Sequence, residues 1–196
     1  MAKKAESTLL NMVLVLTIIA VVTAAALAFL NNVTKGPIAD AKKAKTEAAI
    51  KDVLPEFASL KTAKTMLDGD KDSTNCSMAY DAEGNLVGVA VESSTETGFS
   101  GHLGVMVGFD AEGNITGYSV LETQETPGLG SKAGEWFQKD GNVIGMNPGT
   151  NNMTVKKDGG DVDAITAATI SSRAFCDAVN RAYKAFTNVK GGSDNE

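Results

Sequence analysis

The sequence predicts an α+β fold, in which a single N-terminal transmembrane helix precedes a domain built on an antiparallel sheet with flanking helices. Three observations support this prediction: an apolar run over residues 9–30, two similar stretches at residues 81–91 and 110–120 that each suit a β-hairpin, and an apolar pattern of helical period near the C-terminus. With 196 residues, of which 43% are apolar, the chain is long enough for one domain with a substantial core in addition to the anchor.

The candidate transmembrane segment is LLNMVLVLTIIAVVTAAALAFL at residues 9–30. At about 1.5 Å per residue, a helix of this length crosses a hydrocarbon core of roughly 30 Å. A cleaved signal peptide is the competing interpretation because Lys3 and Lys4 precede the run, but the run is longer than a typical signal-peptide core and lacks a clear cleavage site before Asn31. We therefore predict an uncleaved anchor at residues 9–30 behind a cytoplasmic N-terminus at residues 1–8.

Charges beside the anchor leave its orientation open. Lys3 and Lys4 favour a cytoplasmic N-terminus, whereas a second group of lysines on the other flank favours the opposite orientation: Lys35, Lys42, Lys43 and Lys45.

Residues 31–60 are expected to connect the anchor to the domain as a largely helical segment. The stretch DAKKAKTEAAIKDVL at residues 40–54 is rich in Ala, Lys and Glu, which have high helix propensity. Pro55 lacks an N–H donor and predicts the end of this helix.

Two β-hairpins are predicted from stretches that resemble each other, DAEGNLVGVAV at residues 81–91 and DAEGNITGYSV at residues 110–120. In each, Ala-Glu-Gly-Asn lies between alternating apolar residues, and the glycine suits the positive-φ position of a short loop. The preceding strands are placed at residues 77–80 and 103–109. The middle of the domain is therefore expected to be an antiparallel sheet.

The segment ETPGLGSKAGEWF at residues 125–137 begins with a predicted turn. Pro127 and Gly128 suit the two central positions of a type II turn, and Gly130 allows the backbone to approach another group closely.

The last long element is predicted to be a helix that starts around Thr169. Its apolar residues recur at spacings of four, three and four, as expected of an amphipathic helix packed on a sheet: Phe175, Val179, Ala182 and Phe186. The domain is assigned to residues 61–190. Gly191 and Gly192 are expected to end the helix before a flexible polar tail at residues 191–196.

The composition argues against several classes of function. The net charge of −6 disfavours a nucleic-acid partner, and Cys76 and Cys176 lie far apart with no CxxC or Cys/His cluster, so zinc and iron–sulfur sites have no visible ligand set. A disulfide between them has no support in the sequence, and Cys176 is expected to be a small buried side chain.

His102 is the one histidine, so a hydrolytic triad would depend on it alone. We expect no metal site and no catalytic side chain.

The stretch DAITAATISS at residues 163–172 places several hydroxyl groups at the start of the last helix. On spacing alone the simplest interpretation is helix capping, in which Asp163, Thr166 or Ser171 accepts a hydrogen bond from a free backbone N–H group. The alternative is a phosphate-binding site, because a helix N-terminus offers free N–H groups and the positive end of the helix dipole. The two alanines between the threonines would let such a ligand approach.

Residues 163–172 resemble the D-x-[ST]-[GA]-A-T-x-[ST] signature of the covalent-FMN-binding domain family, which includes the G subunit of the Rnf complex and the C subunit of the sodium-translocating NADH:quinone reductase. In that family a dedicated flavin transferase attaches FMN through its phosphate to the last threonine of the motif, so the resemblance implies Thr169. The family usually has glycine at the position of Ala167, whose methyl group crowds the phosphate but leaves the acceptor hydroxyl in place.

Two further segments carry the same resemblance. Residues 125–130 spell ETPGLG, a string that the family shares, and residues 98–101, GFSG, stand where the family has a GY-x-G segment. The resemblance implies that residues 61–190 form an FMN-binding domain, with Thr126 near the polar rim of the isoalloxazine. The implied flavin-binding residues are Gly98, Phe99, Gly101, Glu125, Thr126, Pro127, Gly128, Leu129, Gly130, Lys132, Thr166, Ala167, Ala168, Thr169, Ile170 and Ser171.

Some neighbouring residues have a simpler structural interpretation. Trp136 and Phe137 suit a buried core better than a stacking role beside a flavin, and a solvated position for Lys132 is commoner than a contact with the flavin phosphate. The family commonly has a histidine a few residues before ETPGLG, where this chain has Thr123 and Gln124. The histidine of this chain therefore takes no implied role.

The resemblance implies an electron carrier, because the flavin supplies the redox chemistry and the protein supplies its position. It implies a membrane-bound Rnf-type complex that couples electron transfer between ferredoxin and NAD to sodium or proton translocation. The other subunits of the complex and a flavin transferase are then the partners. The flavin domain is expected on the extracytoplasmic side of a bacterial or archaeal cell membrane.

Three alternatives stay open. The C subunit of the sodium-translocating NADH:quinone reductase typically has a longer extramembrane part, so the length of this chain favours the Rnf subunit. A pilin-like protein would also have an apolar N-terminal helix before a β-rich domain, but this anchor lacks the glutamate expected near the start of a pilin helix. The third alternative is a membrane-anchored module that binds a flavin without redox turnover.

Overall fold

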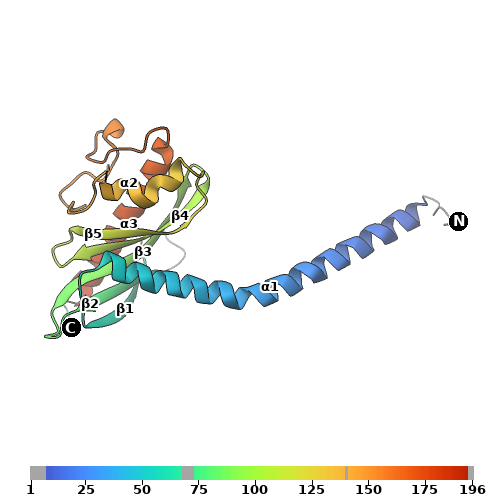
Figure 1. Cartoon of the computed structure of the whole chain (residues 1–196), viewed down its shortest axis with the longest axis horizontal. Helices are drawn as coiled ribbons and strands as arrows, with labels where there is room; N and C mark the ends of the chain where they lie inside the picture. The colour runs from blue at the N-terminus through green and yellow to red at the C-terminus, as the bar shows by residue number, and fades with distance from the viewer. Residues whose placement is uncertain (1–7, 68–72, 140, 194–196) are drawn as a thin grey trace. The chain divides into compact units, whose positions relative to one another are not determined.

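The computed structural model describes residues 8–67, 73–139 and 141–193 (Figure 1). The chain divides into two compact units, Met1–Ala44 and Lys45–Glu196. Of the predicted N-terminus at residues 1–8 only residue 8 is described, and of the predicted tail at residues 191–196 only residues 191–193 are described.

Helix α1 (Leu9–Val53) contains both the predicted anchor and the predicted polar helix, which are joined without a break through Pro37. Among the described residues, α1 is the one helix long and apolar enough to cross a membrane. It ends two residues before Pro55, as that proline predicts. The second unit begins at Lys45, inside the segment that the sequence assigns to the connection.

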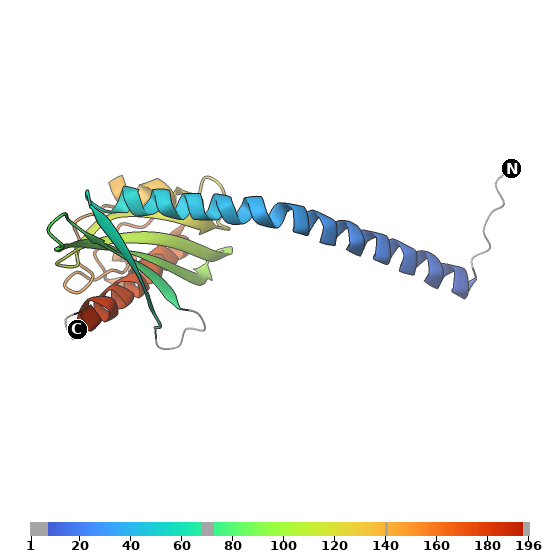
Figure 2. The ribbon, with the colours of Figure 1, turned by 90° about the horizontal axis from the view of Figure 1, so that it is seen from below.

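Five antiparallel strands form one sheet in the order β1-β2-β3-β4-β5, which confirms the predicted fold class (Figures 1 and 2). Their bounds are β1 Ser59–Thr65, β2 Thr74–Tyr80, β3 Leu86–Gly98, β4 Gly101–Asp110 and β5 Ile115–Thr123. Strand β1 was not predicted, and it begins within the segment assigned to the helical connection. It is an edge strand whose polar side chains lie mostly in solvent, so it lacks the alternating apolar pattern that marks the others.

The β2–β3 and β4–β5 loops have the same conformation, which confirms both predicted hairpins. Gly84 and Gly113 adopt φ angles of 87° and 93°, as only glycine does at low cost. In the first loop Asp81 Oδ1 accepts hydrogen bonds from the N–H groups of Glu83 and Asn85 at 2.9 and 2.8 Å, and the second loop repeats the pattern. The shared Asp-Ala-Glu-Gly-Asn string therefore encodes one loop geometry used twice.

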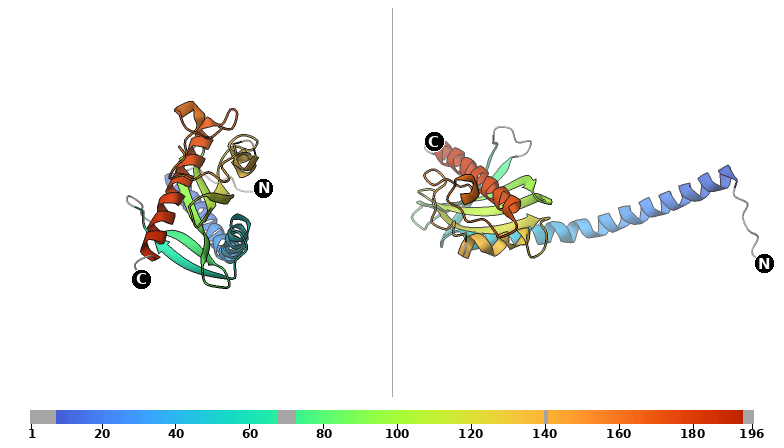
Figure 3. Two further views of the ribbon diagram at one scale, coloured as in Figure 1. Left: turned by 90° about the vertical axis from the view of Figure 1, so that its left-hand side faces the viewer. Right: turned by 90° about the horizontal axis from the view of Figure 1, so that it is seen from above.

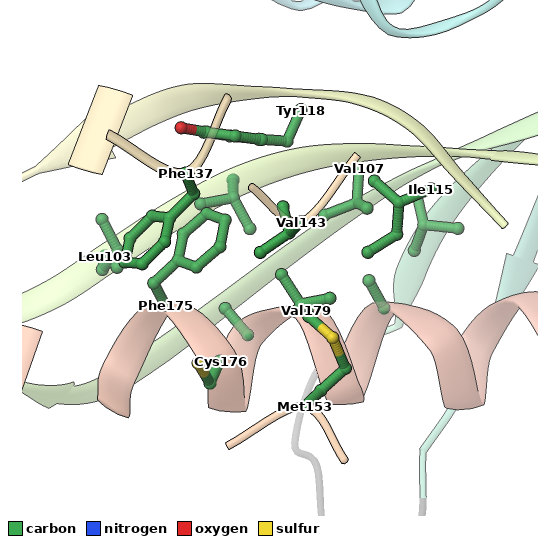
Figure 4. Close-up of a cluster of buried hydrophobic side chains, with 14 of the residues drawn as sticks. Leu103, Val107, Ile115, Tyr118, Phe137, Val143, Met153, Phe175, Cys176 and Val179 are labelled. Atoms are coloured by element: carbon green, nitrogen blue, oxygen red, sulfur yellow. The ribbon is translucent and has the colours of Figure 1, made fainter. Parts of the chain in front are cut away.

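Each face of the sheet is covered by a helix (Figures 2 and 3). Helix α3 (Thr169–Ser193) packs on one face, where its apolar side chains meet those of β3, β4 and β5 in the main core (Figure 4). The last turns of α1 pack on the other face, where Ala49 and Val53, with the following Leu54, form a second apolar cluster with residues of the sheet: Ala79, Ala90, Met106 and Leu121. Gly108 admits this approach, since a Cβ there would overlap the backbone of Val53.

Helix α3 continues through Gly191 and Gly192 to Ser193, so the glycine pair does not end it as predicted. Two glycines lower helix propensity by about 1 kcal/mol each, but the helix is already anchored along its length by the sheet.

Near the N-terminal end of α3, aromatic side chains pack the segments that connect β5 to α3 against the main core. The short helices η1 (Gly130–Lys132) and α2 (Ala133–Lys139) follow β5, and η2 (Lys156–Asp158) lies in the loop before α3. Phe137 stacks on Phe175 with 4.0 Å between ring centroids, and Trp136 Nε1 donates a hydrogen bond to Asp163 O at 2.9 Å. Phe137 thus belongs to the core, as its structural interpretation predicts, and the half-buried Trp136 packs against it.

Cys76 and Cys176 are both free thiols in the main core. Burial raises the pKa of the Cys76 thiol to about 11 and that of the Cys176 thiol to about 12, because a thiolate there would lose its hydration.

Candidate functional site

A cavity of about 310 Å³ lies at the N-terminus of α3, within the second unit. This volume is at the lower end of the range of roughly 300–1,000 Å³ typical of small-molecule sites. Three segments that are distant in sequence line it: the β3–β4 turn, the loop after β5 and the start of α3. The lining residues are Phe99, Glu125, Thr126, Leu129, Gly130, Ala167, Ala168, Thr169, Ile170 and Ser171.

The start of α3 is shaped by a tight turn over residues 165–168. Ala168 N–H donates to Ile165 O at 3.0 Å, and Ala167 adopts a left-handed φ of 63°. That backbone conformation is strained for a residue with a Cβ and unstrained for glycine. The turn itself therefore explains why the family usually has glycine at this position. Crowding of the phosphate by the methyl group, which the sequence suggests, is a second reason.

Ser172 holds this turn in place, although its position in the sequence does not mark it. Its hydroxyl accepts from Ile165 N–H at 2.9 Å and donates to Ala168 O at 3.0 Å. From sequence alone, a serine in the first turn of a predicted helix that hydrogen-bonds to the preceding turn cannot be distinguished from one that faces solvent.

The three residues predicted as capping candidates have other positions. Asp163 forms an ion pair with Lys156 at 2.7 Å, Thr166 is exposed in the turn, and Ser171 donates its hydroxyl to Glu125. The capping interpretation of this stretch is therefore replaced by a turn that Ser172 braces.

Thr169 is the first residue of α3, is half-buried and lines the cavity. The first turn of a helix has N–H groups without intrahelical acceptors and carries the positive end of the helix dipole. An anionic group beside Thr169 would therefore be stabilised by the backbone alone.

Glu125, in the loop after β5, connects the three lining segments through hydrogen bonds. Its side chain is only 6% exposed, its Oε1 accepts from Phe99 N–H at 2.7 Å, and its Oε2 accepts from Ser171 Oγ at 2.9 Å, where Ser171 is 2% exposed. Gly98 and Gly130 make room for the carboxylate, since a Cβ on either would lie 2.6 or 2.5 Å from one of its oxygens. The close approach predicted for Gly130 is thus an approach to Glu125 and Ser171.

The loop after β5 contains the predicted type II turn. Leu129 N–H donates to Thr126 O at 3.2 Å across Pro127 and Gly128, and Gly128 has a φ of 79°. Gly128 N–H also donates to Ser131 Oγ at 3.0 Å, which fixes the turn against η1.

Three large apolar side chains line the cavity yet stay in contact with solvent. Phe99 is 68% exposed, Ile170 is 46% exposed and Leu129 is 42% exposed, and each comes from a different lining segment. Exposed apolar side chains gathered at a cavity are typical of a ligand site. Together with the start of α3, they suit a ligand that has one anionic part and one flat apolar part.

Six of the residues that the resemblance implies do not line the cavity, though most support it. Gly98, Gly101, Pro127 and Gly128 shape the two turns beside it, whereas Lys132 and Thr166 are exposed. His102 contacts Glu96 at 2.6 Å and Glu122 at 3.7 Å and is not among the lining residues. Within the described part of the chain, no group of three or more His, Cys, Asp or Glu side chains is placed to hold a metal ion.

Comparison with known proteins shows that the residues lining this cavity lie within an FMN-binding domain. The FMN-binding domain family matches residues 98–184, a range that starts at the β3–β4 turn and includes every lining residue. A crystal structure of NqrC from Shewanella oneidensis is similar with a TM-score of 0.47 and 19% identity, over 72% of this chain and 73% of that one.

The similar curated proteins are, by name, members of ion-translocating redox complexes. The G subunit of the Na(+)-translocating ferredoxin:NAD(+) oxidoreductase complex of Acetobacterium woodii is 31% identical over 188 residues, which is 90% of each chain. The G subunit of the ion-translocating oxidoreductase complex is 34% identical in Shewanella oneidensis and 37% identical in Shewanella baltica, over 54% and 63% of this chain. These two matches span 52% and 61% of the Shewanella proteins. The chain therefore belongs to the family of G subunits of ion-translocating oxidoreductase complexes, with an FMN-binding domain at residues 98–184.

Proposed function

We propose that this chain is an electron-carrying subunit of an Rnf-type membrane complex and that it holds FMN covalently, through a phosphoester to Thr169. When bound, FMN supplies the redox chemistry, because its ring system accepts and releases electrons. The chain supplies the attachment point, the orientation of the ring and the charges around it.

The residues of the cavity fit FMN. The N–H groups in the first turn of α3 suit the phosphate, and Thr169 presents a hydroxyl at the same place. The exposed side chains of Phe99, Leu129 and Ile170 suit an apolar ring system, which would cover surface that is otherwise in contact with water. This coincidence of an acceptor hydroxyl, a helix N-terminus and apolar walls is the observation that carries the proposal.

Attachment requires that the Thr169 oxygen form a bond to phosphorus. The P–O bond between the FMN phosphorus and the leaving group of an activated flavin donor breaks as this bond forms. The displaced group takes the electron pair of that bond, and the Thr169 hydroxyl proton is released with it. Among the described residues, the lining groups include one carboxylate and no histidine, lysine or cysteine. We therefore assign activation of this step to a separate flavin transferase, with the chain presenting a correctly oriented hydroxyl.

The complex is proposed to pass electrons between ferredoxin and NAD and to couple this transfer to sodium or proton movement. The name of the Acetobacterium woodii relative supports this, since it describes a ferredoxin:NAD(+) oxidoreductase that moves sodium. The three curated sequence relatives named above are all G subunits, so they favour this assignment over the quinone-reductase C subunit. The family match likewise removes the support for a pilin-like protein.

Residues 9–30 of α1 are proposed to anchor the chain in a bacterial or archaeal cell membrane, with the flavin domain on the extracytoplasmic side. Lys184 lies exposed on α3 and both native thiols are buried, so a Lys184→Cys variant offers one accessible thiol in the described part of the chain. A membrane-impermeant maleimide should label this variant in intact cells. Labelling only after lysis would place the domain in the cytoplasm.

The direct test of the covalent flavin is fluorescence of the denatured chain. The full chain is expressed with and without a flavin transferase, and the denaturing gel is illuminated to reveal bound flavin. We expect a fluorescent band only with the transferase, its loss in Thr169→Ala, and its retention in Thr166→Ala, which removes an exposed hydroxyl outside the cavity lining. A dark wild-type band with the transferase present, or a fluorescent Thr169→Ala band, would contradict the proposal.

A further inference from the structure

The wall of the cavity contains a carboxylate that attachment of the flavin does not use. Glu125 is buried, and both of its oxygens accept hydrogen bonds, from Phe99 N–H at 2.7 Å and from Ser171 Oγ at 2.9 Å. Both donors are electrically neutral. The ion pairs formed within residues 8–67, 73–139 and 141–193 all use other carboxylates, so Glu125 has no cationic partner in the described part of the chain.

A carboxylate in such a position is costly to keep. Removal of a charged group from water is unfavourable, and two neutral donors offset only part of that cost. The fold nevertheless makes room for it, because Gly98 and Gly130 both lack the Cβ that would collide with its oxygens. A glutamine could keep hydrogen bonds to Phe99 N–H and Ser171 Oγ without the cost of a buried charge, so the charge itself points to a function.

We infer that Glu125 lowers the redox potential of the flavin, an inference that rests on the proposed binding of FMN in this cavity. Each electron that enters the flavin adds one negative charge, which is cancelled only if a proton from the solvent follows it. A fixed negative charge in the cavity wall opposes this addition, and the opposition is stronger in a poorly solvated wall than in water. Because the effect depends on the sign of the charge, it has the same direction whichever edge of the ring faces Glu125.

Ser171 gives the inference a second, opposite test. Its hydroxyl partly neutralises the carboxylate through the hydrogen bond to Oε2. Loss of that donor leaves the charge of Glu125 less compensated. Ser171→Ala should therefore lower the flavin potential, whereas Glu125→Gln should raise it.

The experiment is a potentiometric titration of the full, flavin-loaded chain in detergent, with dithionite as reductant and soluble mediators. Glu125→Gln keeps the size of the side chain and an acceptor for Phe99 N–H. Glu112→Gln is the matched control, because it removes the same charge from the exposed β4–β5 loop, at the opposite end of β4 from the cavity. We expect a more positive midpoint potential in Glu125→Gln, a more negative one in Ser171→Ala, and no change in Glu112→Gln.

Two results would overturn the inference. One is a midpoint potential in Glu125→Gln that is unchanged or more negative. The other is a shift in Glu125→Asp, which keeps the charge, equal to the shift in Glu125→Gln, since a purely structural role would disturb both alike. If Glu125→Gln fails to fold or to take up flavin, the midpoint potential of Ser171→Ala tests the inference instead. An unchanged or raised midpoint potential in Ser171→Ala then refutes it. A dark wild-type band on the gel is a different outcome, because it refutes the proposed flavin attachment itself.

Discussion

Replacement of Ala167 by glycine should stabilise the protein. Ala167 lies in the turn before α3 with a φ of 63°, in the left-handed region. A residue with a Cβ in that region is disfavoured by about 1–2 kcal/mol. Glycine removes this strain, but it also increases the conformational entropy of the unfolded chain, which costs about 0.4–1 kcal/mol. The difference favours glycine by about 0.5–1 kcal/mol.

A stabilisation of this size should raise the midpoint of thermal unfolding by about 2–3 °C for a domain of this length. The assay is thermal unfolding of the full chain in detergent, followed by circular dichroism. Ala174→Gly is the matched control: Ala174 is buried in the regular part of α3, where the same exchange should destabilise by about 1 kcal/mol or more. Flavin attachment should be at least as fast in Ala167→Gly as in the wild type.

A lower unfolding midpoint in Ala167→Gly would refute the reasoning, because it would mean that Ala167 is not strained in the folded chain. Equal losses in Ala167→Gly and Ala174→Gly would refute it as well. Such a result would show that the turn has an ordinary helical conformation at residue 167.

Three other predictions follow from single contacts. Gly130→Ala should destabilise the protein by about 1–3 kcal/mol and reduce flavin attachment, since its Cβ would lie 2.5 Å from an oxygen of the Glu125 carboxylate. Thermal unfolding measures the loss of stability, and gel fluorescence measures flavin attachment. Wild-type values in both assays would contradict this prediction. The hydrogen bond from Arg173 lowers the pKa of Asp158, so the stabilisation by this pair is present above the usual carboxyl pKa and is lost as the pH falls through the lowered value. Asp158→Asn should therefore flatten the acid side of a stability–pH profile, and an identical profile would contradict the assignment. Cys76 and Cys176 should resist a thiol reagent at about pH 8 until the protein is unfolded, because burial raises both pKa values; rapid labelling of the folded chain would show that the core opens.

The sequence predicted those parts of the fold that short segments encode. The apolar run in α1, the two Asp-Ala-Glu-Gly-Asn loops and the type II turn at Pro127 and Gly128 each depend on residues within a few positions of one another. Strand β1 could not be found in this way, because a polar edge strand is stabilised by pairing with β2 rather than by an apolar pattern of its own. The apolar run at residues 9–30 and the polar helix at residues 40–54 were recognised as separate patterns, and only the structure shows that α1 continues between them through Pro37.

The candidate site was located from its motifs, but its internal contacts were not. Glu125 and Ser171 are 46 residues apart, and their hydrogen bond depends on how β5 and α3 pack. The left-handed conformation of Ala167 and the brace from Ser172 likewise became visible only with the backbone. Motifs therefore indicated which segments meet, whereas packing determined which atoms touch.

The most direct test of the central claim is mass spectrometry of the chain after expression with a flavin transferase and proteolysis. We expect the peptide that contains Thr169 to carry the mass of FMN less one water, and fragmentation to assign the added mass to Thr169 alone. The Thr169→Ala peptide should be unmodified. An added flavin mass on Thr166, Thr126 or Ser171, or no modified peptide at all from the wild-type chain, would contradict the attachment of FMN at the first residue of α3.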